Sequence, residues 1–137
     1  MILTEDNYVK EAEKAIQRLC KNEKKVPRGN RTCIQHPDLV TTSKIRNLLA
    51  MTADIYNEVI NMQSETLTED IVGQINYMKI RFVYEAGREP KVAMLVKEAQ
   101  ILEHLEEIAG QRSQYILFSR YMEALVAYRK FYDDNDD

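Results

Sequence analysis

The apolar residues of this chain recur at intervals of three and four positions, which is the spacing of one face of an α helix. The longest set lies in the segment 42–60: Ile45, Leu48, Leu49, Thr52, Ile55, Tyr56, Val59 and Ile60. Similar stripes occupy about 5–24, 68–86, 90–110 and 113–132. No segment alternates apolar and polar residues as a half-buried strand does. The pattern therefore predicts an all-α fold, a single-domain bundle of about five helices.

Glycine and proline are scarce, at 4 and 3 residues, which is typical of few, long elements. Hydroxyl residues precede the predicted helices and are expected to cap them: Thr4, Thr42 or Ser43, Thr68 and Ser113. Residues 25–41 show no periodicity, so we predict a loop there. This loop begins within a basic cluster, residues 21–31. A nucleic-acid-binding loop and a solvated linker both fit that composition.

The stretch 76–90 combines arginine and tyrosine on one face of its predicted helix. The positions that share this face are Tyr77, Arg81, Tyr84 and Arg88. Another face carries the core stripe: Ile71, Ile75, Met78 and Phe82. A cationic and aromatic face fits a flat, anionic ligand such as nucleic acid. Arginine stacked on tyrosine at the rim of a bundle would give the same pattern.

The chain has 22 acidic and 19 basic residues, a net charge of −3 and a pI near 5.5, which disfavours a free-standing DNA-binding protein. The acids are concentrated in two places: Glu98, Glu103, Glu106 and Glu107, and the terminal Asp133, Asp134, Asp136 and Asp137. We predict an acidic disordered tail over 133–137, after a helical domain over 1–132. Because the remainder is basic, a local cationic surface is compatible with the total.

Signals of catalysis and metal binding are weak. Cys20, Cys33 and His36 lack a fourth ligand at suitable spacing, since His104 lies in a separate predicted helix, where we expect it at the surface or rim. The sequence contains no glycine-rich phosphate loop and no H-E-x-x-H motif. We therefore predict no enzyme, no metal and no cofactor. No apolar run is long enough to span a bilayer, and no secretory signal is visible, so we expect a cytoplasmic protein without a membrane partner.

Three blocks carry a family resemblance: T-T-S-K-I-R-N-L-L at 41–49, K-I-R-F-V-Y-E-A-G-R-E at 79–89 and Y-M-E-A-L-V-A-Y-R-K at 121–130. Together they resemble the small subunit of type III-A CRISPR interference complexes, the Csm complex, over about 41–132. The resemblance implies a non-catalytic helical protein, several copies of which stack in a filament beside the backbone subunit. It also implies partners: guide RNA, target RNA, and the backbone and large subunits, which carry the nuclease activities.

In that family the small subunit contacts the phosphates of the guide–target duplex without reading sequence. Lysine and arginine on rigid helices suit this task, because duplex RNA presents few readable base edges. The predicted RNA contacts are Lys44, Arg46, Lys79, Arg81, Arg88, Arg129 and Lys130. The competing interpretation is a helical protein–protein adaptor with no nucleic-acid role. The net negative charge favours the adaptor, whereas the paired basic residues on three helices disfavour it.

Overall fold

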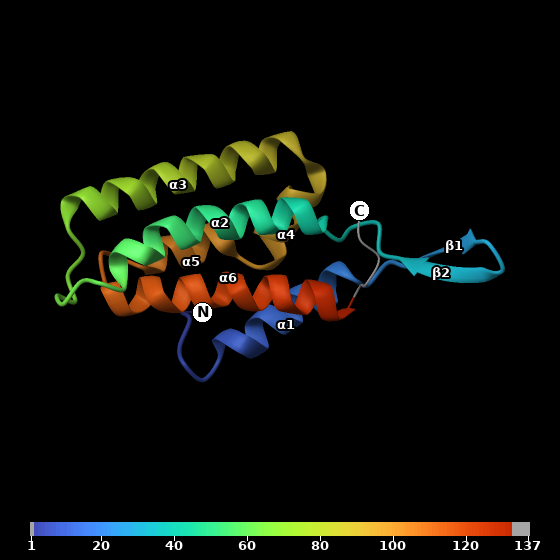
Figure 1. The fold of residues 1–137 in the computed structure, drawn as a ribbon, viewed down its shortest axis with the longest axis horizontal. Helices are drawn as coiled ribbons and strands as arrows, with labels where there is room; N and C mark the ends of the chain where they lie inside the picture. Colours follow the sequence, from blue (N-terminus) through green and yellow to red (C-terminus); the bar gives the residue numbers. More distant parts are fainter. Residues whose placement is uncertain (1, 133–137) are drawn as a thin grey trace.

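The computed structural model describes residues 2–132, with Arg28 described in its backbone alone, and it confirms a predominantly helical bundle (Figure 1). In chain order the elements are α1 (Tyr8–Leu19), β1 (Lys24–Arg28), β2 (Arg31–Gln35), α2 (Thr42–Val59), α3 (Glu69–Arg88), α4 (Pro90–Glu98), α5 (Ile101–Glu107) and α6 (Arg112–Tyr132). The acidic tail predicted over 133–137 lies outside the described residues.

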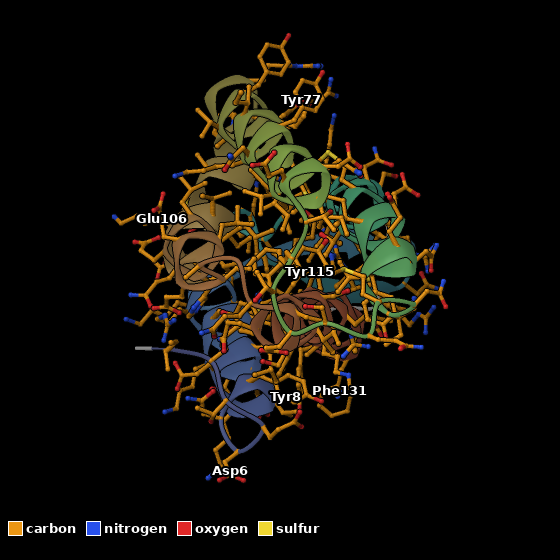
Figure 2. All side chains as sticks on the ribbon, turned by 90° about the vertical axis from the view of Figure 1, so that its left-hand side faces the viewer. Asp6, Tyr8, Tyr77, Glu106, Tyr115 and Phe131 are labelled. Carbon is orange, nitrogen blue, oxygen red and sulfur yellow. The ribbon has the colours of Figure 1, made fainter. Side chains whose placement is uncertain are left out.

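The helix α6 packs against both α1 and α2, and α3 packs against α2 and α4 (Figure 1). The short helices α4 and α5 complete the bundle, with α4 also contacting α1 and α5 contacting α6. The predicted apolar stripes face this interior, where Ile16, Ile45 and Phe82 are fully buried. Tyr115 of α6 lies in the middle of the bundle in the view along its axis (Figure 2). Burial of these faces is the main force that holds the helices together. No helix in the described part of the chain is long and apolar enough to cross a membrane.

Two predicted caps lie close to their predicted places. Thr68 caps α3 as expected, and its hydroxyl oxygen accepts a hydrogen bond from the Ile71 amide at 3.2 Å. The cap of α2 is Thr41, one residue before the prediction, and its hydroxyl accepts from the Lys44 amide at 3.3 Å. Both caps have extended backbone angles, as a capping residue requires. A threonine hydroxyl thus caps the first turn of each of the two long antiparallel helices, α2 and α3.

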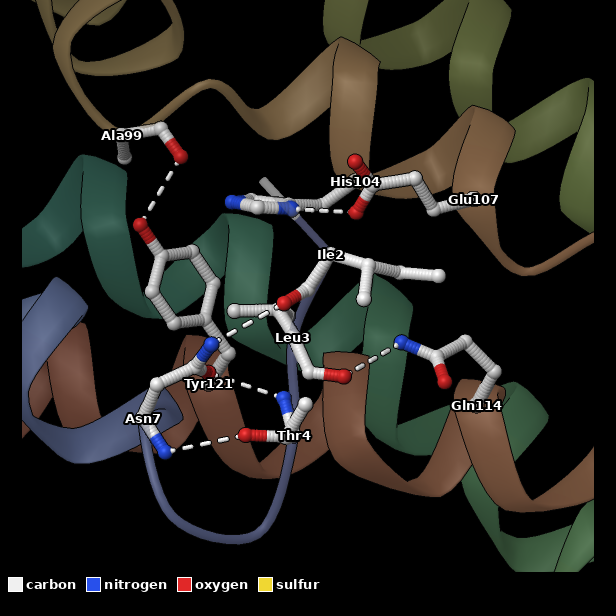
Figure 3. Close-up of polar contacts among 9 residues, drawn as sticks. All are labelled: Ile2, Leu3, Thr4, Asn7, Ala99, His104, Glu107, Gln114 and Tyr121. Carbon is white, nitrogen blue, oxygen red and sulfur yellow. Dashed lines mark hydrogen bonds and ion pairs between the residues drawn. The ribbon is translucent and has the colours of Figure 1, made fainter.

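The other two cap predictions are wrong. Thr4 and Asn7 bond each other in a turn that precedes α1, so the helix begins after Asn7 (Figure 3). Ser113 lies inside the first turn of α6, and its amide and hydroxyl donate to the Glu65 carboxylate. The Thr4 hydroxyl thus accepts from the Asn7 amide before the helix begins, whereas the Ser113 hydroxyl donates to Glu65 and does not cap α6.

The predicted helix over 90–110 is divided into α4 and α5, because Gln100 adopts a left-handed backbone conformation with φ of 52°. The hydroxyl of Tyr121 donates to the Ala99 carbonyl at 2.8 Å, just before this break (Figure 3). Burial, aided by the charge of Glu11, raises the pKa of the Tyr121 phenol, so the group remains a proton donor. A side chain of α6 therefore satisfies a carbonyl that the break removes from the helix ladder.

We expect Tyr121→Phe to lower the free energy of unfolding by about 1–2 kcal/mol, because the buried Ala99 carbonyl loses its donor. Urea denaturation measures this change. Tyr128→Phe is the matched control, since Tyr128 is a half-buried tyrosine of the same helix whose hydroxyl bonds no residue within 2–132. Equal stability of the two variants would contradict the role assigned to the Tyr121 hydroxyl.

Gln100→Gly should have the opposite sign. A residue with a side chain pays about 1–2 kcal/mol to adopt a left-handed conformation, and glycine avoids this cost. The greater freedom of glycine in the unfolded chain offsets part of the stability gained. The expected net effect is a stabilisation of about 0.5–1 kcal/mol in urea denaturation. Glu123→Gly, at an exposed position inside α6, should instead destabilise the protein by about 1 kcal/mol. A destabilised Gln100→Gly variant would show that the side chain of Gln100 contributes more than its backbone strain removes.

His104 is buried, not at the surface or rim as predicted. Only 4% of it is exposed, and its ring meets the Tyr121 ring edge to face with centroids 5.0 Å apart. Its Nδ1 lies 2.9 Å from a carboxylate oxygen of Glu107 (Figure 3). The neighbouring N-terminal segment is also anchored, because Leu3 is buried and its carbonyl accepts from Gln114 at 3.0 Å. This side of the bundle is therefore closed by contacts between distant parts of the chain.

The predicted loop over 25–41 contains a β-hairpin. The strands β1 and β2 pair antiparallel, from Lys24 opposite Gln35 to Arg28 opposite Arg31. Gly29, with φ of 62°, and Asn30 form the two-residue turn. In Figure 1 the hairpin projects beyond the end of the helical bundle. Its strands are too short and too rich in lysine and arginine to show the alternation by which strands are recognised in a sequence.

Candidate nucleic-acid interface

A groove of about 290 Å³ lies where α2 begins, α3 ends and α4 begins. It brings together three of the predicted RNA contacts, Lys44 of α2 with Arg81 and Arg88 of α3. The remaining lining residues are Asn47, Leu48, Met51, Glu85 and Val92. The helical spacing of Arg81 and Arg88 puts them on one face, and the packing of α2 beside α3 adds Lys44. We call these three cations the basic groove.

Each cation of the basic groove already has a neighbour. Lys44 Nζ lies 3.5 Å from a carboxylate oxygen of Glu89, and the Arg81 guanidinium lies 3.9 Å from Glu85, one turn along α3. Arg88 lies over the ring of Tyr84, 5.9 Å from its centroid. These pairs are partly solvated, so each contributes at most about 1 kcal/mol. They orient the cations and still allow an incoming phosphate to take the place of a carboxylate.

The outward face of α3 is aromatic and apolar next to the basic groove. Tyr77 and Tyr84 are 62% and 57% exposed, and Tyr77 points away from the bundle (Figure 2). Ile80 and Val83 are also more than half exposed on this helix. The predicted face of alternating tyrosine and arginine is therefore solvent-accessible. The two exposed aliphatic residues were not part of that prediction, because they lie outside both the core stripe and the tyrosine–arginine positions.

Four predicted contacts lie outside the basic groove, two of them on α2 and α3. Arg46 is exposed on α2 and makes no ion pair with any residue in the described range. Lys79 forms an ion pair with Glu106 of α5, on a different side of α3 from Arg81. This placement agrees with the helical spacing, which puts Lys79 on another face from Arg81 and Arg88. Pairing with Lys79 also offsets the charge of Glu106, one of the four glutamates concentrated in the segment 98–107.

The sequence predicts Arg129 as an RNA contact, which requires an exposed side chain, but Arg129 is buried in α6. It is only 4% exposed, and its Nε donates to the Val40 carbonyl at 2.9 Å. Its position, four residues after Leu125 and seven after Met122, puts it on the buried stripe of α6. This spacing was the signal that could have identified it as a core residue. Lys130, the next residue, is exposed.

A second groove, of about 700 Å³, lies between α2 and the first half of α3. Its lining includes the apolar residues Met51, Ile55 and Met78, of which Met51 is half-buried and the other two are buried. Its carboxylates come from Asp54, Glu69 and Asp70. The other lining residues are Gly73, Gln74, Tyr77 and Arg81. We call it the acidic groove. The sequence shows one sign of this groove, because Glu69 and Asp70 directly follow the predicted cap Thr68. Their closeness to Asp54 depends on the packing of α2 against α3 and could not be read from the sequence.

No metal centre is found within residues 2–132, where no group of three or more histidine, cysteine, aspartate or glutamate side chains is placed to hold an ion. Cys20 and Cys33 form no disulfide.

Comparisons with known proteins connect this geometry to a family. The family model described as Csm2 Type III-A matches residues 13–135. A protein of Streptococcus thermophilus named CRISPR system Cms protein Csm2 is 43% identical over 135 residues, 98% of each chain. A protein of the same name from Mycobacterium tuberculosis is 36% identical over 136 residues, 99% of each chain. Another, from Enterococcus italicus, is 37% identical over 99 residues, 71% of each chain.

Proposed function

The chain belongs to the Csm2 family of type III-A CRISPR systems, and from this premise we propose that it is the non-catalytic small subunit of an RNA-guided effector complex. In this role several copies stack beside the backbone and large subunits. Each copy contacts the sugar–phosphate backbone of the guide–target RNA duplex and does not read its sequence. The complex acts in the cytoplasm, where its RNA target is found.

The observation that carries the RNA contact is the basic groove, in which Lys44, Arg81 and Arg88 converge on one surface from two rigid helices. A cluster of cations suits this task, because A-form RNA is recognised mainly through phosphates and 2′-hydroxyls. Tyr84 holds Arg88 in place through its ring. Because none of these contacts depends on base identity, binding through this groove is independent of sequence.

The remaining predicted contacts take different roles in this proposal. Arg46 and Lys130 are exposed near the same end of the bundle and can extend the cationic surface. Lys79 serves mainly to join α3 to α5 through Glu106. Arg129 is a structural residue, because its guanidinium is buried and bonded to Val40.

Stacking is supported by the uneven distribution of charge along the long axis. The hairpin and the basic groove occupy one end, where α2 starts and α3 ends (Figure 1). The opposite end, around the start of α3, carries Glu65, Glu69 and Asp70. Opposite charges at the two ends favour head-to-tail contact between copies, which is a heterologous interface and can repeat.

Affinity purification of the tagged protein from its native cells tests this function. We expect short RNAs of defined length and several larger proteins in fixed ratio, with the yield of RNA falling steeply as salt rises. Recovery of the protein without RNA or other subunits would favour the alternative, a helical protein–protein adaptor. The net charge of −3 is the one observation that supports that alternative.

A further inference from the structure

The β1–β2 hairpin has little support from the rest of the chain. Neither strand packs substantially against any helix within residues 2–132. Lys24, Lys25 and Arg31 are exposed and make no ion pair in this range, and Ile34 is 44% exposed. A two-stranded hairpin alone is only marginally stable in water. An ordered hairpin that exposes three cations and one aliphatic side chain is complemented by a partner surface that is acidic and partly apolar.

The acidic groove offers those properties. Asp54, Glu69 and Asp70 form no ion pair within the described chain, although Asp70 accepts a hydrogen bond from Gln74 at 3.0 Å. The helix dipole explains the acids at the start of α3, but it does not explain Asp54 in the middle of α2. Between these carboxylates the groove is lined by the half-buried Met51 and the exposed Tyr77, and the buried Ile55 and Met78 also contribute to its wall. It therefore complements the hairpin in charge and in apolar character.

The two features lie too far apart to meet within one molecule. The hairpin projects from the end of the bundle where α2 begins, whereas the first turns of α3 lie at the opposite end of the long axis (Figure 1). We infer that the hairpin of one copy occupies the acidic groove between α2 and α3 of the next copy. This inference rests on the stacking included in the proposed function, and it names the elements that make the contact.

The register of the hairpin suits this arrangement. Lys25 lies opposite Ile34, and such cross-strand partners project from the same face of a ribbon. That face presents a cation beside an aliphatic side chain, as the groove presents carboxylates beside Met51 and Tyr77. Five residues per strand give the hairpin a length of about 17 Å, enough to reach beyond the bundle end. Each copy has one hairpin and one groove, so the contact propagates from copy to copy.

Zero-length carbodiimide cross-linking of the assembled wild-type particle, followed by peptide mass spectrometry, tests the contact directly. We expect Lys25, which shares the docking face with Ile34, to be joined to Asp54, Glu69 or Asp70. Because the hairpin projects away from the bundle, while Asp54 lies along α2 and Glu69 and Asp70 lie at the far end, such a cross-link must connect two copies. A particle with several copies but without this cross-link overturns the inference and leaves stacking intact. A particle with one copy overturns the proposed stacking as well. Cross-linking of this lysine to RNA alone, under ultraviolet light, would instead assign the hairpin to RNA.

Charge exchange gives a second, independent readout. Lys24→Glu with Lys25→Glu, or Asp54→Lys with Asp70→Lys, should at least halve the copies of this subunit per particle in native mass spectrometry. Combining all four substitutions should restore the wild-type number, because the charges are again complementary. Lys10→Glu, at an exposed position of α1, is the control and should leave the number unchanged.

Melting temperatures identify any variant that fails to fold. If a variant does not fold, the cross-link in the wild-type particle alone tests whether the hairpin occupies the groove of the next copy. Wild-type copy numbers in both charge-reversed pairs would overturn the inference. So would a folded fourfold variant that assembles no better than either pair.

Discussion

Replacing Lys44, Arg81 and Arg88 by glutamine should weaken binding of the guide–target duplex by the assembled particle about tenfold or more at physiological salt. The reason is that each residue places a positive charge in the basic groove without being needed for the core. The logarithm of affinity should also depend less on the logarithm of salt concentration, by about one unit for each phosphate contact removed. Fluorescence anisotropy with a labelled target RNA, measured over a series of salt concentrations, gives both quantities.

The matched control is Lys79→Gln, which removes a cation from the same helix but on the side that faces Glu106 of α5. Its affinity and salt dependence should stay close to wild type. If the triple variant binds with wild-type affinity and salt dependence, the basic groove does not contact RNA. If Lys79→Gln has the larger effect, the RNA lies on the side of α3 that faces α5. These outcomes concern RNA alone and leave the hairpin contact between copies to its own test.

Arg129→Met should lower the free energy of unfolding by about 2–4 kcal/mol, which is a large part of the stability of a domain of this size. The substitution keeps much of the side-chain volume but leaves the Val40 carbonyl without the guanidinium that bonds it at 2.9 Å. The buried carbonyl then loses its donor in a place that water reaches poorly. Thermal unfolding should show a fall in melting temperature of about 6–15 °C.

Lys130→Met is the control for this substitution, because it removes the neighbouring charge at an exposed position. It should change the melting temperature by no more than a degree or two, since exposed substitutions are worth less than about 0.5 kcal/mol. An Arg129→Met protein that melts like wild type but binds RNA less well would contradict the structural role. That result would support the RNA contact that was predicted for Arg129 from the sequence.

The helical part of the fold is predictable from the sequence because helix formation and amphipathicity are local. The periodic residues of α2, such as Ile45, Leu48 and Ile55, face the core as their spacing requires. The exposed tyrosines and arginines of α3 follow from the same geometry, which is why Arg81 and Arg88 were correctly placed on one face. Thr68 was recognised as a cap because a cap contacts amides only two or three residues away.

The rest depends on residues that are distant along the chain. Lys44 becomes part of the basic groove only because α2 packs beside α3, and Arg129 is buried because its partner is Val40, 89 residues away. The break at Gln100 is stabilised by Tyr121, which reaches Ala99 from α6. The hairpin arises from pairing between strands whose composition carries almost no strand signal.

The sequence by itself therefore determined the helices, their buried faces, one outward tyrosine–arginine face and the family to which the blocks belong. The tertiary structure decided which of those faces meet. Periodicity describes the environment of one helix at a time, whereas a groove is formed by two helices, and its charge depends on which side chains packing brings together. For the same reason, only the folded chain revealed the acidic groove between α2 and α3 and the basic hairpin that projects beyond the bundle.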